Sequence, residues 1–318
     1  MAYLFLILGI ALLIAGGEVL VKGAVNIAVR ARISTLVVGM TIVSFGTSAP
    51  ELVVSLKAAL QGHPDISIGN VLGSNVANLA LVLGLTALTS PIRVDRNSIR
   101  FDWPMMLLVT TLLYLFMLDL ELERWEGVVI FVVLILFSLF LIFESRRYNK
   151  RSRVEDEVDE TATKGSVWRD VLYIALGSIG LALGSEWLVD GATEVARNLG
   201  VSDLLISSTI VAFGTSTPEL ITSITAAVRK ETNISIGNLI GSNIFNIAAI
   251  LGITAITIPI PINEAVLRVD FWWVAGITLL VFPFMLNNRK ISRVEGGILF
   301  IFYLAFIISG VLLEKDVF

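Results

Sequence analysis

Long apolar segments alternate with short polar ones along almost the whole chain. A membrane-spanning helix needs about 20 predominantly apolar residues. By this measure the sequence predicts ten spans, of which the fourth and the ninth are short. Their rough bounds are Ala2–Val21, Leu36–Ala59, Ile66–Leu88, Trp103–Leu118, Gly127–Phe143, Val167–Val189, Leu204–Val228, Ile234–Ile256, Phe271–Leu286 and Gly296–Leu313. The first span has no basic residue ahead of it, so we interpret it as a retained membrane helix.

Polar residues recur at matching positions in the two halves of the chain. "TIVSFGTSAPEL" from Thr41 and "TIVAFGTSTPEL" from Thr209 agree at ten of twelve residues, 168 positions apart. "ISIGNVLGSNVANLA" from Ile66 likewise matches "ISIGNLIGSNIFNIA" from Ile234. Each half holds five predicted spans, and because five is odd, the second half crosses the membrane in the opposite direction. Inverted repeats are typical of secondary transporters, whose site lies near the bilayer midplane between the repeats.

The expected fold is an all-α polytopic membrane protein with ten transmembrane helices arranged as two inverted five-helix repeats. We place the first half at residues 1–144, a linker at 145–166 and the second half at 167–318. The segment Ser145–Gly165 combines "RRYNKRSR" with "EDEVDE" and has few apolar residues, which predicts a solvated connection with no role in the site. A calcium- or lipid-sensing role is the alternative, but the segment lacks the spacing of a known calcium loop.

Composition narrows the function classes. The chain is 56% hydrophobic and 16% charged, as expected for a membrane protein, and its net charge of −4 indicates no nucleic-acid surface. It has no cysteine and one histidine, His63. Neither a thiolate nor a histidine metal site can therefore be built from it.

Lysine and arginine are distributed unevenly between the two membrane sides. Of the 23 basic residues, 18 lie in or beside the loops that follow the odd-numbered spans. Cytoplasmic loops carry an excess of Lys and Arg. We therefore expect a cell-membrane protein with a cytoplasmic linker and with both termini outside.

Each repeat places a glutamate inside a strongly apolar segment, directly after a proline. Glu51 follows Pro50, and Glu219 follows Pro218. A charged residue at mid-membrane depth costs about 2.5–3.5 kcal/mol on insertion scales. Proline has no N–H, so a carbonyl about one turn earlier loses its helical partner. In a membrane such a carbonyl needs another partner, and a bound cation is one solution.

Hydroxyl and amide groups accompany these glutamates. The hydroxyls within one turn of them belong to Thr47, Ser48, Thr215 and Ser216. The third and eighth spans carry polar residues at every fourth position, and therefore on one helix face: Asn70, Ser74, Asn78, Asn238, Ser242 and Asn246. Calcium and similar hard cations prefer such oxygens, whereas zinc and copper prefer imidazole or thiolate. The pattern indicates a hard-cation site.

A packing role competes with this interpretation, because small and hydroxyl-bearing residues in membrane helices often serve only helix association. The symmetric duplication of a costly glutamate favours the site. Glu18 and Glu186 lie near span ends, and Glu18 has Lys22 one turn away, so snorkelling or an ion pair explains them better. Four further acids at predicted membrane interfaces are interpreted as anchors: Asp102, Glu126, Asp270 and Glu295.

The duplicated motifs resemble the α-repeats of sodium/calcium exchangers, in the cation/calcium antiporter superfamily. "GTSAPE" with Glu51, "GTSTPE" with Glu219 and the two "GNxxGSNxxN" blocks carry the resemblance, which covers nearly the whole chain. The resemblance implies an antiporter of the prokaryotic type, not an enzyme. Such an antiporter exchanges Ca²⁺ for Na⁺ by alternating access and needs no cofactor. It also implies that the first and sixth helices slide as a pair over the other eight. The glycines that suit such a sliding surface are Gly16, Gly17, Gly180 and Gly184.

The resemblance also implies a ligand set centred on Glu51 and Glu219. Oxygens around the helix break bind as well in the family, and the carbonyl at the position of Ser44 and Ala212 binds sodium there. Ser74 and Ser242 match further sodium ligands. The full expected set is Glu51, Glu219, Thr47, Thr215, Ser48, Ser216, Ser44, Ala212, Ser74, Ser242, Asn78 and Asn246.

Asn246 departs from some relatives, which carry aspartate there. Potassium-dependent members are associated with an acid at that point, so potassium dependence is not expected. With asparagine at both Asn78 and Asn246, the site has a formal charge of about −2. One Ca²⁺, or Na⁺ ions or protons in its place, can neutralise that charge.

The coupling ion and the transport class have alternatives. Proton/calcium exchangers usually carry an acid after their "GN" block, where this chain has Gly73 and Ser74, so sodium is the expected counter-ion. The first alternative is a proton-coupled antiporter of Ca²⁺ or another cation. The second is a calcium channel, which an inverted repeat in one chain disfavours. The expected partners are Ca²⁺, Na⁺ and the lipid bilayer, and in the first alternative also H⁺. A monomer is sufficient for this function.

The uneven distribution of Lys and Arg predicts a labelling pattern. The chain has no cysteine, so single-cysteine variants report position directly. A Ser152→Cys variant should resist an impermeant thiol reagent added to intact cells, whereas Phe318→Cys should react. The opposite pattern would refute the expected orientation.

Overall fold

The computed structural model describes residues 2–152, 166–199 and 212–315. Within these ranges, nine helical segments are long and apolar enough to cross a membrane. Another predicted span, Leu204–Val228, begins in the interval 200–211, outside the described residues. Its described part consists of two short helices. The predicted helical membrane architecture is confirmed.

The elements of the first half follow each other as α1 (Ala2–Ala31), α2 (Thr35–Val38), the π-helical segment η1 (Gly39–Val43), α3 (Ser44–Leu60), α4 (Pro64–Val76), η2 (Ala77–Val82), α5 (Leu83–Thr89), β1 (Ile92–Arg93), η3 (Ser98–Asp102), α6 (Trp103–Phe116), β2 (Glu121–Leu122) and α7 (Arg124–Ser152). Several of these join into one span: α2, η1 and α3 form the second, and α4, η2 and α5 form the third.

The elements of the second half are α8 (Val167–Asn198), α10 (Ala212–Thr215), α11 (Thr217–Val228), α12 (Thr232–Phe245), η6 (Asn246–Leu251), α13 (Gly252–Thr257), β3 (Ile260–Pro261), η7 (Val266–Asp270), α14 (Phe271–Leu286), β4 (Lys290–Ile291) and α15 (Arg293–Lys315). Four of the π-helical segments form two matching pairs between the halves, η2 with η6 and η3 with η7. Single π-helical turns are frequent at functional sites, and the first of these pairs contains Asn78 and Asn246.

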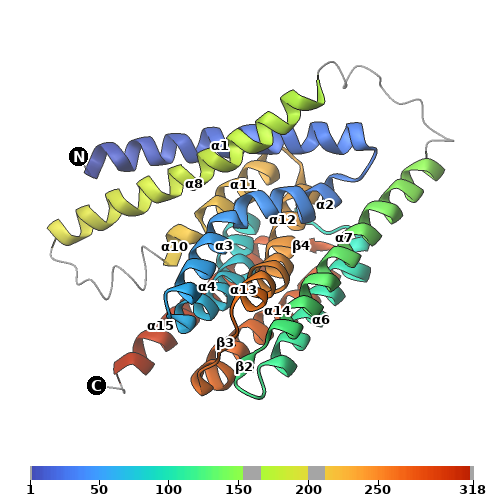
Figure 1. Ribbon diagram of the computed structural model, residues 1–318. Helices are drawn as coiled ribbons and strands as arrows, with labels where there is room; N and C mark the ends of the chain where they lie inside the picture. Colours follow the sequence, from blue (N-terminus) through green and yellow to red (C-terminus); the bar gives the residue numbers. More distant parts are fainter. Residues whose placement is uncertain (1, 153–165, 200–211, 316–318) are drawn as a thin grey trace.

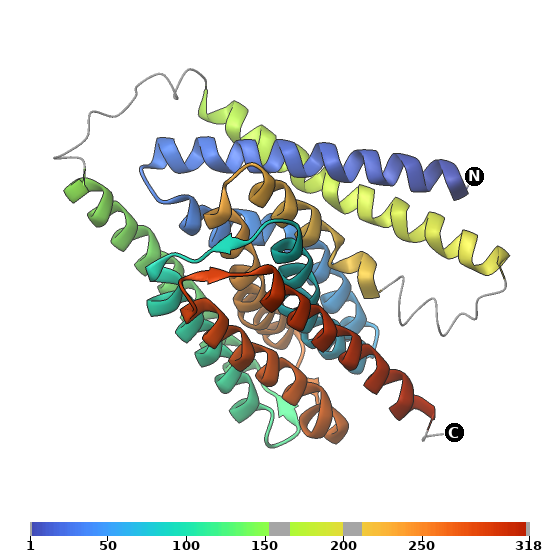
Figure 2. The same ribbon diagram turned by 180° about the vertical axis from the view of Figure 1, so that it is seen from behind.

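Two long helices, α1 and α8, lie side by side along one face of the bundle formed by the other helices (Figure 1; Figure 2). They contain 30 and 32 residues, well beyond the length that a span requires. A helix longer than the bilayer is thick tilts to remain in it. The sequence prediction ended both helices too early, because their final turns carry charged residues.

Glycines at intervals of seven residues allow α1 and α8 to approach closely. A Cβ atom on Gly16 would lie 2.9 Å from the backbone N of Leu181, and one on Gly184 would lie 2.9 Å from that of Leu13. Both distances are too short for any side chain, so only glycine is compatible with this packing.

This packing corrects the role expected for the glycines. Gly16, Gly180 and Gly184 were assigned to a surface that slides over the bundle, but each faces the partner helix. Only Gly17 of the four faces the bundle, where a Cβ would lie 3.0 Å from Cγ2 of Ile221 on α11. Most of these glycines therefore hold α1 and α8 together.

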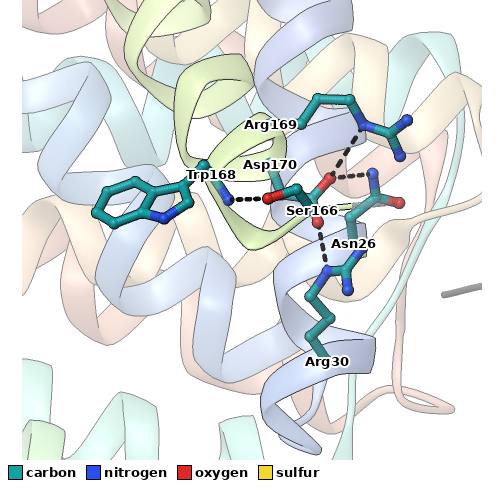
Figure 3. Close-up of polar contacts among 6 residues, drawn as sticks. All are labelled: Asn26, Arg30, Ser166, Trp168, Arg169 and Asp170. Carbon is teal, nitrogen blue, oxygen red and sulfur yellow. Dashed lines mark hydrogen bonds and ion pairs between the residues drawn. The ribbon is translucent and has the colours of Figure 1, made fainter. Parts of the chain in front are cut away.

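A buried charge ties the same two helices at the end next to the linker (Figure 3). The carboxylate of Asp170, near the start of α8, is 0% exposed. It accepts hydrogen bonds from Nε of Arg30 at 2.6 Å and from Nδ2 of Asn26 at 2.8 Å, both on α1. Removing one partner of a buried pair of this kind typically costs about 3–5 kcal/mol. Together with the glycines, this contact makes α1 and α8 one unit.

The two halves interlock by contacts that occur twice with the roles exchanged. Strand β1 pairs antiparallel with β4, and β2 pairs antiparallel with β3. Two glycine contacts repeat in the same way: a Cβ on Gly84 would lie 2.9 Å from the carbonyl O of Gly296, and one on Gly127 would lie 2.7 Å from that of Gly252. The inverted repeat seen in the sequence is thus also a repeat of contacts.

Three of the acids interpreted as interfacial anchors are buried in the structure. Glu126 accepts a hydrogen bond from the backbone N of Glu123 at 2.8 Å, and Glu295 accepts one from that of Ser292 at 2.7 Å. These carboxylates cap the matching helices α7 and α15. Asp102 is 0% exposed and its carboxylate has no hydrogen-bond partner among the described residues. Its interfacial position stays a prediction.

The close approach of α1 and α8 predicts that a bulky residue at Gly184 destabilises the protein. Overpacking typically costs about 1–3 kcal/mol, so Gly184→Leu should lower the melting temperature of the detergent-purified protein by several degrees. Gly310→Leu is the matched control, because a Cβ at Gly310 meets nothing within 4 Å. Equal melting temperatures for the two variants would contradict the packing described.

Candidate ion-binding site

The two glutamates singled out in the sequence meet where the halves join. Glu51 lies within α3 and Glu219 in the first turn of α11, and they are 1% and 0% exposed. Ser48, one turn before Glu51, donates a hydrogen bond from its Oγ to Oε1 of Glu219 at 3.0 Å. Each repeat therefore contributes one carboxylate to the same buried location.

The prolines act differently in the two copies. In the second copy α10 ends at Thr215, Ser216 forms a turn, and α11 begins with Pro218 in its first turn. The carbonyl of Gly214, four residues before this proline, accepts a hydrogen bond from the hydroxyl of Ser185 on α8. The freed carbonyl predicted from the sequence is therefore present, and a side chain satisfies it.

In the first copy the helix does not break. Pro50 lies inside α3, which runs without interruption from Ser44 to Leu60 and follows the π-helical segment η1. The helix is thus interrupted at Pro218 but not at Pro50. A proline removes only one helical hydrogen bond, so the surrounding contacts decide whether the helix opens.

Amides from α4 and α12 connect the glutamate-bearing helices to their neighbours. Asn238 accepts a hydrogen bond from Oγ1 of Thr47 at 3.2 Å and donates one to Oγ of Ser223 at 3.1 Å. In the other half, Asn70 donates to Oγ of Ser55 at 2.9 Å. The sequence interpretation missed Ser55 and Ser223. Their signal was available, because each serine lies four residues after its glutamate, on the same helix face.

A second amide network crosses between the halves. Asn246 donates from Nδ2 to Oδ1 of Asn75 at 3.1 Å, and Asn75 donates to the carbonyl of Asn243 at 3.3 Å. Asn75 and Asn243 were also missed, because they lie off the face defined by the four-residue spacing. They hold the crossing of α4 with α12, and Oδ1 of Asn246 remains without a partner among the described residues.

The other expected ligands lie on the same elements. Ser44 is buried and donates to the carbonyls of Gly39 at 2.8 Å and of Asn238 at 3.1 Å, so its hydroxyl is engaged in packing. Ala212 begins α10. Thr215 is half-buried, whereas Ser74 is 4% exposed and Ser242 0% exposed.

Buried oxygens without partners are the main electrostatic feature of this region. Among the described residues, seven oxygens of the expected ligand set have no hydrogen-bond partner. They are Oε1 and Oε2 of Glu51, Oε2 of Glu219, Oδ1 of Asn78, Oδ1 of Asn246, Oγ of Ser216 and Oγ of Ser242. Burying such groups without compensation is strongly unfavourable.

Counter-charge from the protein is missing in the part of the chain that the structure covers. There, no Lys, Arg or His is buried, and no group of three or more His, Cys, Asp or Glu could hold a metal ion. Two carboxylates with hydroxyl and amide oxygens remain. This set can bind hard cations with a total charge of about +2 and does not suit metals that prefer nitrogen or sulfur.

A cavity of about 640 Å³ lies beside the site. It is bounded by α8 on one side and by α3, α10 and α11 on the other, and its lining includes Pro50, Thr215, Pro218, Glu186 and Asp190. The cavity thus reaches the prolines that precede both glutamates. It provides space through which an ion could approach the buried oxygens.

Known proteins resemble this chain over nearly its whole length. A family model described as "Sodium/calcium exchanger protein" matches residues 1–143 and 170–310. CaxA of Alkalimonas amylolytica is 39% identical, over 96% of this chain and 97% of that protein. The sodium/calcium exchanger MaX1 of Methanosarcina acetivorans is 31% identical, over 96% and 97%.

A solved structure also matches. The sodium-calcium exchanger NCX_Mj, soaked with zero Na⁺ and Ca²⁺, superimposes with a TM-score of 0.82 at 31% sequence identity. The match covers 97% of this chain and 98% of that one. The same exchanger soaked with Na⁺ and Sr²⁺ gives a TM-score of 0.81.

Proposed function

Because this chain belongs to the sodium/calcium exchanger family, we propose that it exchanges Ca²⁺ for Na⁺ by alternating access, with Glu51 and Glu219 as the shared ion site. At the coarser level it is a multi-pass membrane protein and a cation/calcium antiporter. The observation that carries the finer proposal is the pair of buried carboxylates whose oxygens lack partners in the described protein.

The proposed ligands follow from the inventory of oxygens. The hard donors are the two carboxylates, the hydroxyls of Thr47, Ser48, Thr215, Ser216, Ser74 and Ser242, the amides of Asn78 and Asn246, and the carbonyls of Ser44 and Ala212. Calcium takes six to eight oxygen ligands, and sodium uses the same kind of donor. No enzyme chemistry and no cofactor is part of the proposal.

Competition for one charge explains antiport. Two carboxylates balance one Ca²⁺, or two monovalent cations, so binding of one kind of ion displaces the other. A doubly charged empty site in a low-dielectric environment opposes any motion that buries it further, whereas a neutralised site permits that motion. Exchange without net leakage follows from this difference.

Asn246 argues against a potassium requirement. Its Nδ2 donates to Asn75, and its neutral amide adds no negative charge to the site. A third monovalent cation therefore has no carboxylate to balance it. The counter-ion in the proposal is therefore Na⁺ and not K⁺. A proton is the alternative counter-ion, and the transport assay described below distinguishes it from Na⁺.

The moving parts in this proposal are α1 and α8. They form one unit through the glycine contacts and Asp170, and α8 borders both the cavity and the carbonyl of Gly214. With the orientation predicted from Lys and Arg, the linker is cytoplasmic and the cavity opens toward the outside. One chain contains the whole site.

The proposal predicts that a single carboxylate is insufficient. Glu51→Gln or Glu219→Gln preserves shape and removes one charge, so a bound Ca²⁺ leaves surplus positive charge in a buried site. Calcium affinity should fall at least about 100-fold, since unbalancing a buried charge pair costs about 3–5 kcal/mol. Sodium-driven ⁴⁵Ca uptake into proteoliposomes should be lost. Glu121→Gln is the control, because Glu121 is an exposed residue of β2.

The same assay distinguishes the alternatives. Uptake driven by a sodium gradient supports the proposal, whereas uptake driven only by a proton gradient establishes proton coupling. Calcium flux without any ion on the opposite side would establish a channel. Near-normal sodium-driven exchange by Glu51→Gln would show that the two carboxylates are not the shared site.

A further inference from the structure

An ion pair joins α1 to the end of α11, on the side of the bundle where α1 ends and α8 begins, which is called the linker side. Glu18 of α1 lies with Oε1 3.0 Å from Nη2 of Arg229, which follows the last turn of α11. The sequence suggested Lys22 as the partner of Glu18. The ion pair is present, but its base is Arg229, and Nζ of Lys22 lies over the ring of Tyr173, 5.3 Å from its centroid.

The inverted repeat provides an internal comparison for this pair. A shift of 168 positions relates Glu18 to Glu186 and relates Arg229 to Gln61. Both halves therefore carry the acid on the long helix, but only the second half has a base at the position of Arg229. At the position that matches Arg229, the first half therefore has the neutral side chain of Gln61. The basic residue in the last turn of α3 is Lys57, one turn before Gln61.

The helices are packed together next to Glu18 and separated at the matching place in the other half. Next to Glu18, α1 contacts α11: a Cβ on Gly17 would lie 3.0 Å from Cγ2 of Ile221. The counterparts of this pair are Ser185 and Val53, and both line the cavity of about 640 Å³. Ile221 is half-buried, whereas Val53 is 64% exposed. The structure is therefore closed where the ion pair exists and open where it is missing.

We propose that the ion pair between Glu18 and Arg229 is a latch that holds the linker side closed and favours the conformation open on the opposite side. This inference rests on the alternating access of the proposed function. For the linker side to open, α1 must leave α11 and the pair must separate. Among the residues that the structure describes, no ion pair joins α8 to α3, so the equivalent opening there breaks none and the two conformations differ in energy.

The size of the bias follows from the exposure of the pair. The side chains of Arg229 and Glu18 are 42% and 54% exposed, and ion pairs in such settings shift an equilibrium by roughly two- to fivefold. An effect of this size sets the resting population of the two conformations without preventing transport. It also lies within the range that accessibility measurements resolve.

The test uses a matched pair of single-cysteine reporters. Val53→Cys reports the open cavity, and Ile221→Cys reports its symmetric counterpart, in a chain that has no cysteine of its own. Each reporter is combined with an otherwise unchanged chain, with Glu18→Gln, with Arg229→Gln, and with the exchanged pair Glu18→Arg and Arg229→Glu. The rate of modification by a small hydrophilic thiol reagent is measured in detergent without Ca²⁺ and at one Na⁺ concentration, the same for every variant.

Loss of the latch should raise the ratio of the Ile221→Cys rate to the Val53→Cys rate by roughly two- to fivefold. The exchanged pair should return the ratio toward its original value. Gln61→Arg, which builds the missing base beside Glu186, should also raise the ratio, since it stabilises closure on the cavity side. Monodisperse elution of every variant confirms that it is folded.

An unchanged ratio in Glu18→Gln and Arg229→Gln would overturn the latch, as would failure of the exchanged pair to restore it. The ratio is independent of ion transport, so its outcome can be separated from that of the proposed function. If the ratio shifts as expected while no calcium exchange is found, the latch stands and the proposed function fails. If exchange is normal and the ratio is unchanged, the latch alone fails.

Discussion

Two carboxylates are buried beside each other without a basic side chain to balance them. Glu51 and Glu219 are almost completely inaccessible, and no Lys, Arg or His is buried in the described part of the chain. Most proteins avoid this arrangement or pair such acids with arginine. Here the neighbouring hydroxyls and amides satisfy the carboxylates only in part. Ser48 donates a hydrogen bond to one oxygen of Glu219, whereas both oxygens of Glu51 lack a hydrogen-bond partner among the described residues. The rest of the structure either creates this pair or provides access to it.

The inverted repeat is the means by which the pair is created. Each half supplies one glutamate, and the strand pairs and glycine contacts that join the halves occur twice. Perfect symmetry would leave the two membrane sides equivalent. The departures from symmetry are therefore informative: the helix breaks at Pro218 but not at Pro50, Ser185 satisfies the carbonyl of Gly214, and Arg229 stands where the other half has Gln61.

Much of this could be predicted from the sequence, because burial in a membrane leaves a strong pattern. The ten apolar segments, the repeat and the two glutamates follow from hydropathy and self-similarity, and the twelve expected ligands lie on the second, third, seventh and eighth spans, where the prediction placed them. Contacts between distant segments could not be predicted in the same way. Asn75 and Asn243 lie off the expected face, and Glu18 pairs with a residue 211 positions away rather than with the neighbouring Lys22. The glycines signalled close packing correctly, but the sequence alone does not say which helix they contact.

The most direct test of the shared carboxylate site is equilibrium calcium binding to the purified protein at increasing sodium concentration. A single site predicts one Ca²⁺ per chain. Its apparent dissociation constant should rise with sodium concentration, while the maximal occupancy stays constant. Replacing both glutamates with glutamine should remove binding altogether, because no carboxylate is left to balance the ion. Calcium binding that sodium does not affect, or one equivalent of calcium retained by the doubly substituted protein, would contradict this description of the site.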